Sequence, residues 1–167
     1  MSYVGSYMWQ LRQKVGDMRI LTVTVDAVVA NEKGEVKLVY VPHVNGWASV
    51  GGHAEYGDTW QTAALHELEE EAGIIAREED LEPFAAMSGP ERIFHYQDGT
   101  TQPFTLCFVV RSWEKEVEQT DKEEIPEMKW VTLEEAFEMD LTESTRTLLM
   151  AYQKYLETGR FQMVDFK

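Results

Sequence analysis

The sequence predicts a domain that mixes strands with helices, built either as α+β or in α/β/α layers. Three observations support this prediction. A β-branched, apolar run at 20–30 is typical of a buried strand. A glycine-rich segment at 51–57 leads into a helical pattern that ends at Gly73, a residue suited to a left-handed C-terminal cap. A second helical pattern, at 142–158, is amphipathic and is expected to cover the sheet.

The other elements follow from the spacing of apolar residues and from turn-forming residues. The first two strands flank the turn at 31–34 and are expected to pair as a hairpin. In chain order, we expect a helix at 3–15, strands at 20–30, 36–41 and 47–50, a helix capped by Asp58 or Thr59, strands at 81–87, 92–97, 104–113 and 128–131, a helix after Thr132, and the helix at 142–158 with Leu148, Leu149, Tyr152 and Leu156 facing inward.

Composition limits the classes of function. The formal charge of −15 argues against binding to a nucleic-acid backbone, because no basic patch offsets the acidic residues. An anionic substrate would need a metal ion to approach such a surface. The single cysteine, Cys107, lies in an apolar run and cannot form an internal disulfide. A buried structural thiol in a reducing cytosol is its expected state.

The length of 167 residues predicts a single domain over 1–167, with 1–17 as an N-terminal helical extension. Tyr7, Met8 and Trp9 give this extension several large apolar side chains. Two interpretations stay open, packing on the same domain or on a second subunit in a homodimer. No long apolar stretch or basic signal segment is present, so we expect no membrane span, no export and a cytoplasmic protein.

The central helix carries an arc of carboxylates. Helical positions advance by about 100° per residue, so Glu67, Glu70 and Glu71 share one arc, whereas Glu69 points away. Three carboxylates on one face repel one another unless a cation neutralises them. Oxygen ligands on a short rigid arc suit Mg²⁺ or Mn²⁺, which would also bind phosphate oxygens. A solvated acidic face is the alternative, and the preceding glycines and the apolar neighbouring face favour the metal site.

The segment from Gly52 to Ile74 resembles the Nudix box, Gly-x5-Glu-x7-Arg-Glu-U-x-Glu-Glu-x-Gly-U, in which U is a bulky apolar residue. Two positions depart from it, because Asp58 stands where the family has Glu and His66 where it has Arg. The resemblance implies an α/β/α sandwich with a mixed central sheet. The matching positions are Gly52, Glu67, Leu68, Glu70, Glu71, Gly73 and Ile74.

The resemblance also implies the activity, which is metal-dependent hydrolysis of a nucleoside diphosphate linked to another moiety. Such a reaction needs charge neutralised on phosphate oxygens and a water molecule made nucleophilic. Carried over to this chain, the metal ligands would be Glu67, Glu70, Glu71 and the carbonyl oxygen of Gly51. Glu67 would also position or deprotonate the attacking water.

A further acid, from the loop before the strand at 128–131, often completes the site in this family. Glu124 is the best match by position, ahead of Glu123 and Glu127. An equally simple interpretation is that these acids only keep the loop solvated.

Residues that contact the rest of the substrate are harder to identify. Trp47 and Phe94 are suited to stack on a base, although aromatic residues in strands more often belong to the core. Arg92 is suited to bind a phosphate or, equally, to form an ion pair at the surface. The expected substrate is a small nucleoside diphosphate derivative, either ADP-ribose-like or nucleotide-type, and the sequence does not distinguish the two.

Two other functions are compatible with the same box. A nucleotide-sensing domain without catalysis is suggested by the departures at Asp58 and His66, and it would bind nucleotide tightly without metal-dependent turnover. An isomerase of isoprenoid diphosphates needs an active-site cysteine, and Cys107 in a strand core is poorly suited to that role. The hydrolase is the preferred interpretation.

The two departures are interpreted as linked. In the family, the Glu and Arg at these places can pair across the junction between loop and helix. An Asp58–His66 contact would keep the sign of this pairing only while the histidine is protonated. In the alternative interpretation, Asp58 only caps the helix and His66 is solvated.

Overall fold

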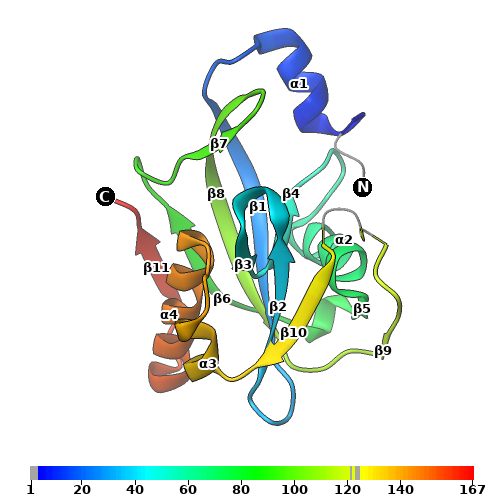
Figure 1. Cartoon of the computed structure of the whole chain (residues 1–167), viewed down its shortest axis with the longest axis vertical. Helices are drawn as coiled ribbons and strands as arrows, with labels where there is room; N and C mark the ends of the chain where they lie inside the picture. The colour runs from blue at the N-terminus through cyan, green and yellow to red at the C-terminus, as the bar shows by residue number, and fades with distance from the viewer. Residues whose placement is uncertain (1–3, 121, 123–124) are drawn as a thin grey trace.

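The computed structural model describes residues 4–120, 122 and 125–167. Its strands and helices are interspersed along the chain (Figure 1). In order, they are α1 (Tyr7–Val15), β1 (Ile20–Val29), β2 (Val36–Val41), η1 (Pro42–Val44), β3 (Gly46–Ala48), β4 (Val50–His53), α2 (Trp60–Ala72), β5 (Ile74–Ile75), η2 (Glu78–Asp80), β6 (Leu81–Ser88), β7 (Phe94–Tyr96), β8 (Gly99–Val110), β9 (Lys115–Glu116), β10 (Glu127–Val131), α3 (Leu133–Glu138), α4 (Glu143–Thr158) and β11 (Gln162–Asp165).

The main sheet has the strand order β11-β6-β8-β1-β4, and β7 pairs with β8. β1 runs parallel to β8 and antiparallel to β4, so the sheet is mixed, as predicted. A smaller sheet has the order β10-β2-β3, and β5 pairs with β9. Because β1 has a partner on each edge, it forms the centre of the site described below.

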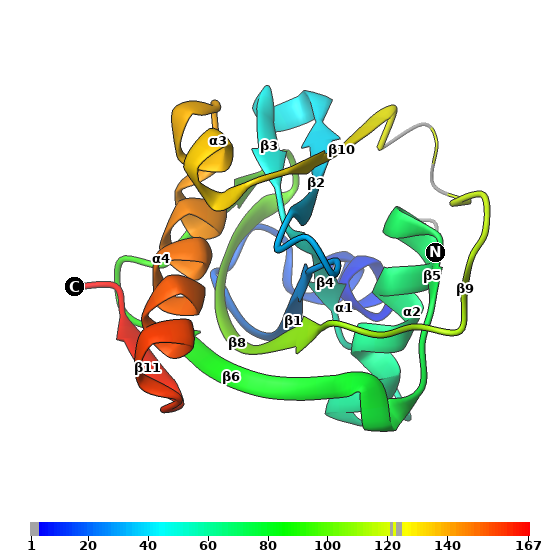
Figure 2. The ribbon, with the colours of Figure 1, turned by 90° about the horizontal axis from the view of Figure 1, so that it is seen from below.

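Side chains on β1 alternate between two cores, because successive residues of a strand point to opposite faces. Val25, Ala27 and Val29 pack with the apolar face of α2. Val28 packs with α4, on the other side of the sheet. Figure 2 shows α2 and α4 on opposite sides of the β1–β8 pair. The predicted α/β/α arrangement is therefore confirmed.

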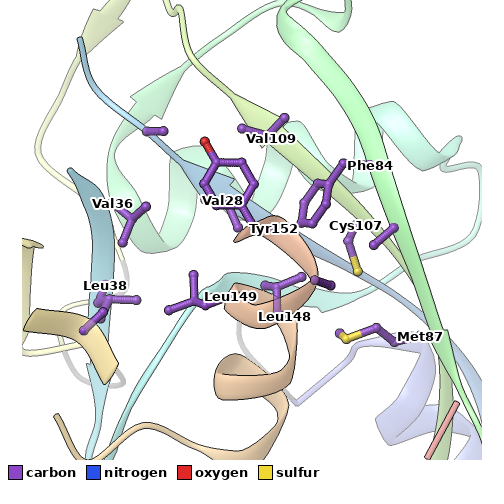
Figure 3. Close-up of a cluster of buried hydrophobic side chains, with 14 of the residues drawn as sticks. Val28, Val36, Leu38, Phe84, Met87, Cys107, Val109, Leu148, Leu149 and Tyr152 are labelled. Carbon is purple, nitrogen blue, oxygen red and sulfur yellow. The ribbon is translucent and has the colours of Figure 1, made fainter. Parts of the chain in front are cut away.

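The core beneath α4 contains the predicted inward face of that helix. Figure 3 shows Leu148, Leu149 and Tyr152 against apolar side chains of the strands. Cys107 is fully buried in the same cluster, as expected for a structural thiol. Leu156 was expected to face inward, but 52% of it is exposed. The last turn of α4 thus extends beyond the sheet that the helix covers.

Several predicted elements differ from the observed ones. The prediction that the first two strands pair as a hairpin is wrong. Only an isolated bridge joins Ala30 to Val36, and β2 belongs to the smaller sheet. Gly51 and Gly52 were expected in a loop but belong to strand β4, which pairs with β1. β11 was not predicted. Among the described residues, no helix combines the length and apolar character needed to cross a membrane.

Helix α2 begins and ends where its sequence dictates. Thr59, one of the two predicted caps, is the N-cap and forms a capping box with Thr62. Gly73 adopts φ 65° and ψ 27°, a left-handed conformation that a residue without Cβ adopts at little cost. The buried Lys37 ammonium donates a hydrogen bond to the carbonyl oxygen of Ala72 (3.3 Å), in the last turn. A cation at this end also interacts favourably with the helix dipole.

Candidate active site

The edge strand β4 meets α2 at two glycines. The N–H of Gly51 donates a hydrogen bond to Oε2 of Glu71 (2.9 Å). The carboxylate of Glu67 lies against Gly52 so closely that a Cβ at this position would clash with it. The absence of side chains on the strand therefore lets two carboxylates from the helix approach the backbone.

The predicted arc of carboxylates is present on α2. Glu67, Glu70 and Glu71 are half-buried at the side of the helix, whereas Glu69 is exposed. The backbone carbonyl of Glu70 accepts a hydrogen bond from the N–H of Thr120 (3.1 Å), so the acidic loop begins beside this arc. The apolar face of the helix, with Leu68 fully buried, fixes the orientation of the arc.

Within the described part of the chain, no three acidic, histidine or cysteine side chains are gathered closely enough to hold a metal ion. The donor chemistry nevertheless fits a hard divalent cation, because Glu67 and Glu71 converge on the backbone of β4. Glu70 lies on the same side of the helix, one residue before Glu71.

The loop between β4 and α2 is held by Asp58. Its Oδ2 accepts a hydrogen bond from the N–H of Glu55 (2.8 Å), and its Oδ1 accepts one from the hydroxyl of Thr62 (3.2 Å). Nδ1 of His66 lies 3.5 Å from the same Oδ1. Glu55 accepts hydrogen bonds from the N–H of Tyr7 at both carboxylate oxygens (2.8 and 3.1 Å). The loop is therefore connected to both α1 and α2.

On the opposite face of β1, Asp26 faces the side of the sheet that α4 covers. Its Oδ2 lies 3.7 Å from Nη2 of Arg92. The Asp26 side chain is 18% exposed, whereas that of Arg92 is 2% exposed. Burial raises the pKa of the Asp26 carboxyl to about 6, and the charge of Arg92 opposes this shift. A perturbed carboxyl beside Gly51 is a candidate functional group.

His53 lies on the same face as Asp26. It pairs with Thr24 across the two strands, and Asp26 pairs with Gly51. Burial lowers the pKa of His53 to about 4, so the ring is neutral near pH 7. Its Nε2 is buried and has no hydrogen-bond partner among the described residues. A neutral imidazole of this kind can donate or accept one further hydrogen bond.

The predicted substrate residues occupy different surroundings. Trp47 is 9% exposed, with the Lys129 ammonium 4.6 Å from its ring centre, so most of its surface belongs to the core. Phe94 is half-buried, and the guanidinium of Arg92 lies 5.2 Å from its ring centre. The structure brings Arg92 and Phe94 together and leaves Trp47 on the smaller sheet. Glu124 and Glu123 lie outside the described residues.

Comparison with known proteins assigns this geometry to a family. The model of the NUDIX domain matches residues 20–152. The chain belongs to the Nudix family. It is 33% identical over 103 residues to the nucleoside triphosphatase NudI of Enterobacter sp. (strain 638), covering 60% of this chain and 71% of that protein. The matches confirm the predicted class of enzyme, a Nudix-type pyrophosphohydrolase.

Solved structures of Nudix proteins share the fold. The MutT NUDIX hydrolase from Burkholderia pseudomallei superposes with a TM-score of 0.63 at 18% identity, covering 78% of this chain and 97% of the other. The NUDIX domain of Shewanella oneidensis NrtR, complexed with ADP ribose, gives a TM-score of 0.66 at 19% identity, covering 93% and 99%. Helix α1 precedes the matched Nudix segment.

Neither Asp26 nor His53 was predicted from the sequence to be a functional residue. Asp26 and His53 lie on strands before α2, and neither belongs to the fixed positions of the Nudix box. A signal for Asp26 was present, because it is the one charged residue in the apolar run at 20–30. A charge inside an apolar strand needs a partner or a function. For His53, only the fold reveals the neighbours.

Proposed function

We propose that this Nudix enzyme hydrolyses a diphosphate bond in a nucleoside diphosphate linked to another moiety, with Mg²⁺ or Mn²⁺ as its cofactor. The observation that supports this most directly is the convergence of Glu67 and Glu71 on the glycine backbone of β4. A strongly acidic chain, with a charge of −15, repels phosphate unless cations intervene. The acidic arc is the place where such cations would bind.

The residues that would hold the cation are Glu67, Glu70, Glu71 and the carbonyl oxygen of Gly51. When bound, a divalent cation supplies neutralisation of phosphate charge and a lower pKa for bound water. The β4 backbone fixes one side of this site, and the rigid helix fixes the other. A site held between two regular elements keeps its geometry better than one built on loops.

Glu67 is the proposed residue that orients or deprotonates the attacking water. It lies closest to Gly52, at the point where strand and helix meet. A carboxylate in hydrogen-bond reach of a water can take its proton as the bond to phosphorus forms. We also propose that an acid of the loop before β10, with Glu124 as the first choice, completes the site. Thr120, which begins this loop, donates its N–H to the carbonyl of Glu70.

The experiment is a turnover assay over a panel of substrates, with Mg²⁺, with Mn²⁺ and with chelator. Three names among the relatives guide the panel. One is a nucleoside triphosphatase, one domain was solved with ADP ribose, and one structure is a UDP-X diphosphatase. Nucleoside triphosphates, ADP-ribose and UDP-sugars therefore belong in it. Phosphate-containing products that form only with metal would support the proposal. No product from any member of the panel would contradict it.

A sensing domain is the second candidate, because the box departs at Asp58 and His66. In the structure Asp58 lies on the loop before α2 and contacts His66, which is exposed on the helix. They hold the loop rather than contribute to the carboxylate arc. Tight nucleotide binding without metal-dependent turnover would favour the sensor over the hydrolase.

A further inference from the structure

A polar strip crosses the face of β1 and β8 that lies toward α4. Thr22, Thr24 and Asp26 alternate along β1 and therefore share this face. The hydroxyl of Thr24 is hydrogen-bonded to that of Thr105 on the neighbouring strand. His53, directly opposite Thr24 on β4, points to the same side. The strip thus extends across three strands, next to the glycines of the candidate active site.

Two residues of this strip, Thr22 and His53, carry buried polar atoms that have no hydrogen-bond partner among the described residues. Over the residues that the structure describes, five buried side-chain nitrogen or oxygen atoms lack a hydrogen-bond partner. Four of them belong to Thr22, His53, Arg92 and Thr101, and the fifth belongs to Gln119, which lies elsewhere. A buried polar group without a hydrogen-bond partner destabilises the folded protein. The atoms of Thr22 and His53 lie on the same face as Asp26, where a polar ligand would satisfy them.

Asp26 is the charged member of the strip and is under-satisfied. Its ion-pair partner, Nη2 of Arg92, lies 3.7 Å from its Oδ2, which is beyond hydrogen-bond distance. No donor of the described residues forms a hydrogen bond to this carboxylate. A carboxylate accepts hydrogen bonds and, when ionised, donates none. Asp26 is therefore matched to the hydroxyl or N–H donors of a ligand.

The position of Asp26 identifies the part of the substrate that reaches it. Asp26 pairs with Gly51 across the strands, and its carboxylate lies so close to Gly51 that a Cβ there would clash. Gly51 also donates its N–H to Glu71 of the acidic arc. Asp26 and the acidic arc therefore meet at Gly51, so a group attached to phosphates bound beside the arc can reach Asp26.

Arg92 holds Asp26 from behind. Its guanidinium is 2% exposed and donates hydrogen bonds to the Thr105 hydroxyl, the carbonyl of Pro103 (3.3 Å) and the Ser144 hydroxyl (3.0 Å). Phe94 and Phe166 cover it, with ring centres 5.2 and 5.5 Å away. So buried a side chain cannot contact a substrate phosphate without rearrangement. Its charge instead compensates that of Asp26.

We propose that Asp26 is a specificity-determining residue that accepts hydrogen bonds from the nucleoside of the substrate, and that Arg92 is the positioning residue for its carboxylate. The inference rests on the proposed function, because it assumes a nucleoside diphosphate derivative as substrate. The donors are either the ribose hydroxyls or an amino group of the base. Aspartate accepts from a ribose hydroxyl in other nucleotide sites, so both sources have suitable chemistry.

Calorimetric binding of nucleoside diphosphates in Mg²⁺ tests the proposal without requiring turnover. The pair ADP and 2′-deoxyADP differs in one ribose hydroxyl, and the pair GDP and IDP differs in the amino group of the base. The wild-type protein should prefer the donor-bearing member of one pair by about 10- to 100-fold, as expected for a hydrogen bond to a charged group. In Asp26→Asn and Asp26→Ser this preference should approach unity.

Asp165→Asn is the matched control, because this exposed carboxylate lies on β11 at the other edge of the sheet. It should keep the wild-type preference. Absence of nucleotide binding, absence of a preference in the wild-type protein, or an unchanged preference in both Asp26 variants would overturn the inference. Binding with the expected preference but no turnover would instead contradict only the proposed hydrolase.

Two further variants test the role of Arg92. Arg92→Lys keeps a cation near Asp26, whereas Arg92→Met removes it. Both should lower the melting temperature, because hydrogen bonds to Thr105 and Ser144 are lost. Only Arg92→Lys should retain a nucleotide preference. If both variants keep the full preference despite their lower melting temperatures, Arg92 has a structural role alone.

Discussion

Nδ1 of His66 lies 3.5 Å from Oδ1 of Asp58, so the two residues that depart from the Nudix box contact each other. Asp58 is 10% exposed and fixed by hydrogen bonds from Glu55 and Thr62, whereas His66 is 60% exposed. Because Thr59 caps the helix, capping is not the role of Asp58. The pair joins the loop to α2. As in the Glu–Arg pair of the family pattern, the acid lies on the loop and the base on the helix.

His66→Arg is therefore expected to stabilise the protein most at alkaline pH. Arginine stays charged throughout, whereas histidine loses its charge as pH rises. The gain should stay below about 1 kcal/mol, because the pair is partly exposed to solvent. Melting temperatures from pH 6 to 9 measure it. The control is His43→Arg, which adds the same charge at an exposed position on η1. A gain that is flat across pH, or equal in the control, would contradict the linked pair.

Metal affinity should depend on the carboxylates of the arc and not on their exposed neighbour, Glu69. Glu70→Gln and Glu71→Gln each remove an anionic ligand while keeping the shape of the side chain, so Mn²⁺ affinity and turnover should fall together. Glu69→Gln is the matched control, because Glu69 is exposed on the same turns of the helix. Calorimetry with Mn²⁺ measures the affinity. Equal affinities in all three variants would place the metal elsewhere.

Glu67→Gln should cost more turnover than Glu124→Gln. Glu67 would be both a metal ligand and the group that orients water, and each role contributes on the order of 10²-fold or more. An acid of the loop can be replaced by a neighbouring acid or by solvent. Single-turnover rates at saturating metal compare the two variants. Equal losses would remove this ranking, and a larger loss in Glu124→Gln would make the loop acid the base.

Local structure was predictable from the sequence because it depends on near neighbours. Thr59, Gly73 and the apolar face of α2 define that helix without reference to the rest of the fold. Strand pairing was not predictable in this way, because β1 pairs in parallel with β8, which lies far along the chain. The hairpin prediction failed because a turn at 31–34 reverses the chain without forcing the two strands to pair. β11 is short and half exposed at the sheet edge, so its pattern carries little signal.

The metal arc was predictable for the same reason as the helix that carries it. Glu67 and Glu71 share a helical face whatever the fold. The contribution of Asp26 and His53 depends on the register between β1 and β4, which places them around Gly51 and Thr24. A one-residue shift in this register would turn one strand's side chains to the opposite face. Tertiary structure therefore had to be known before the polar strip was visible.

His53 makes stability fall in mildly acidic solution. Burial lowers its pKa from 6.5 to about 4, so the unfolded chain binds a proton more readily than the folded protein between these values. Its contribution is full above pH 6.5 and is lost as pH falls toward 4, amounting to about 2 kcal/mol by pH 5. His53→Gln cannot titrate and should lack this part of the pH dependence. Urea unfolding at pH 7.5 and pH 5 gives the two free energies, and the same difference in both proteins would contradict the assignment.

Helix α1 is anchored to the rest of the chain by Arg12. This residue is 5% exposed and donates hydrogen bonds to the carbonyls of Gly16 (3.0 Å), Met18 (2.6 Å) and Thr100 (2.7 Å). At the other end of the helix, the Tyr7 ring lies edge-on to Tyr56, with centroids 4.6 Å apart. The apolar residues of α1 thus pack in part on their own chain. The predicted homodimer through this segment stays a prediction.

A chain that begins at Met18 tests both roles of α1. Loss of the contacts to Glu55 and Tyr56 should lower the melting temperature and reduce turnover, because the loop between β4 and α2 loses its support. Light scattering gives the mass of the full-length and shortened chains. A mass that falls from dimer to monomer would place α1 at the interface, and an unchanged mass would remove it from there. Arg12→Met in the full-length chain is the companion variant, because it releases the anchor but keeps the apolar residues. If α1 supports the loop through this anchor, Arg12→Met should reproduce the loss of turnover without a change in mass, and wild-type turnover in both proteins would contradict that role.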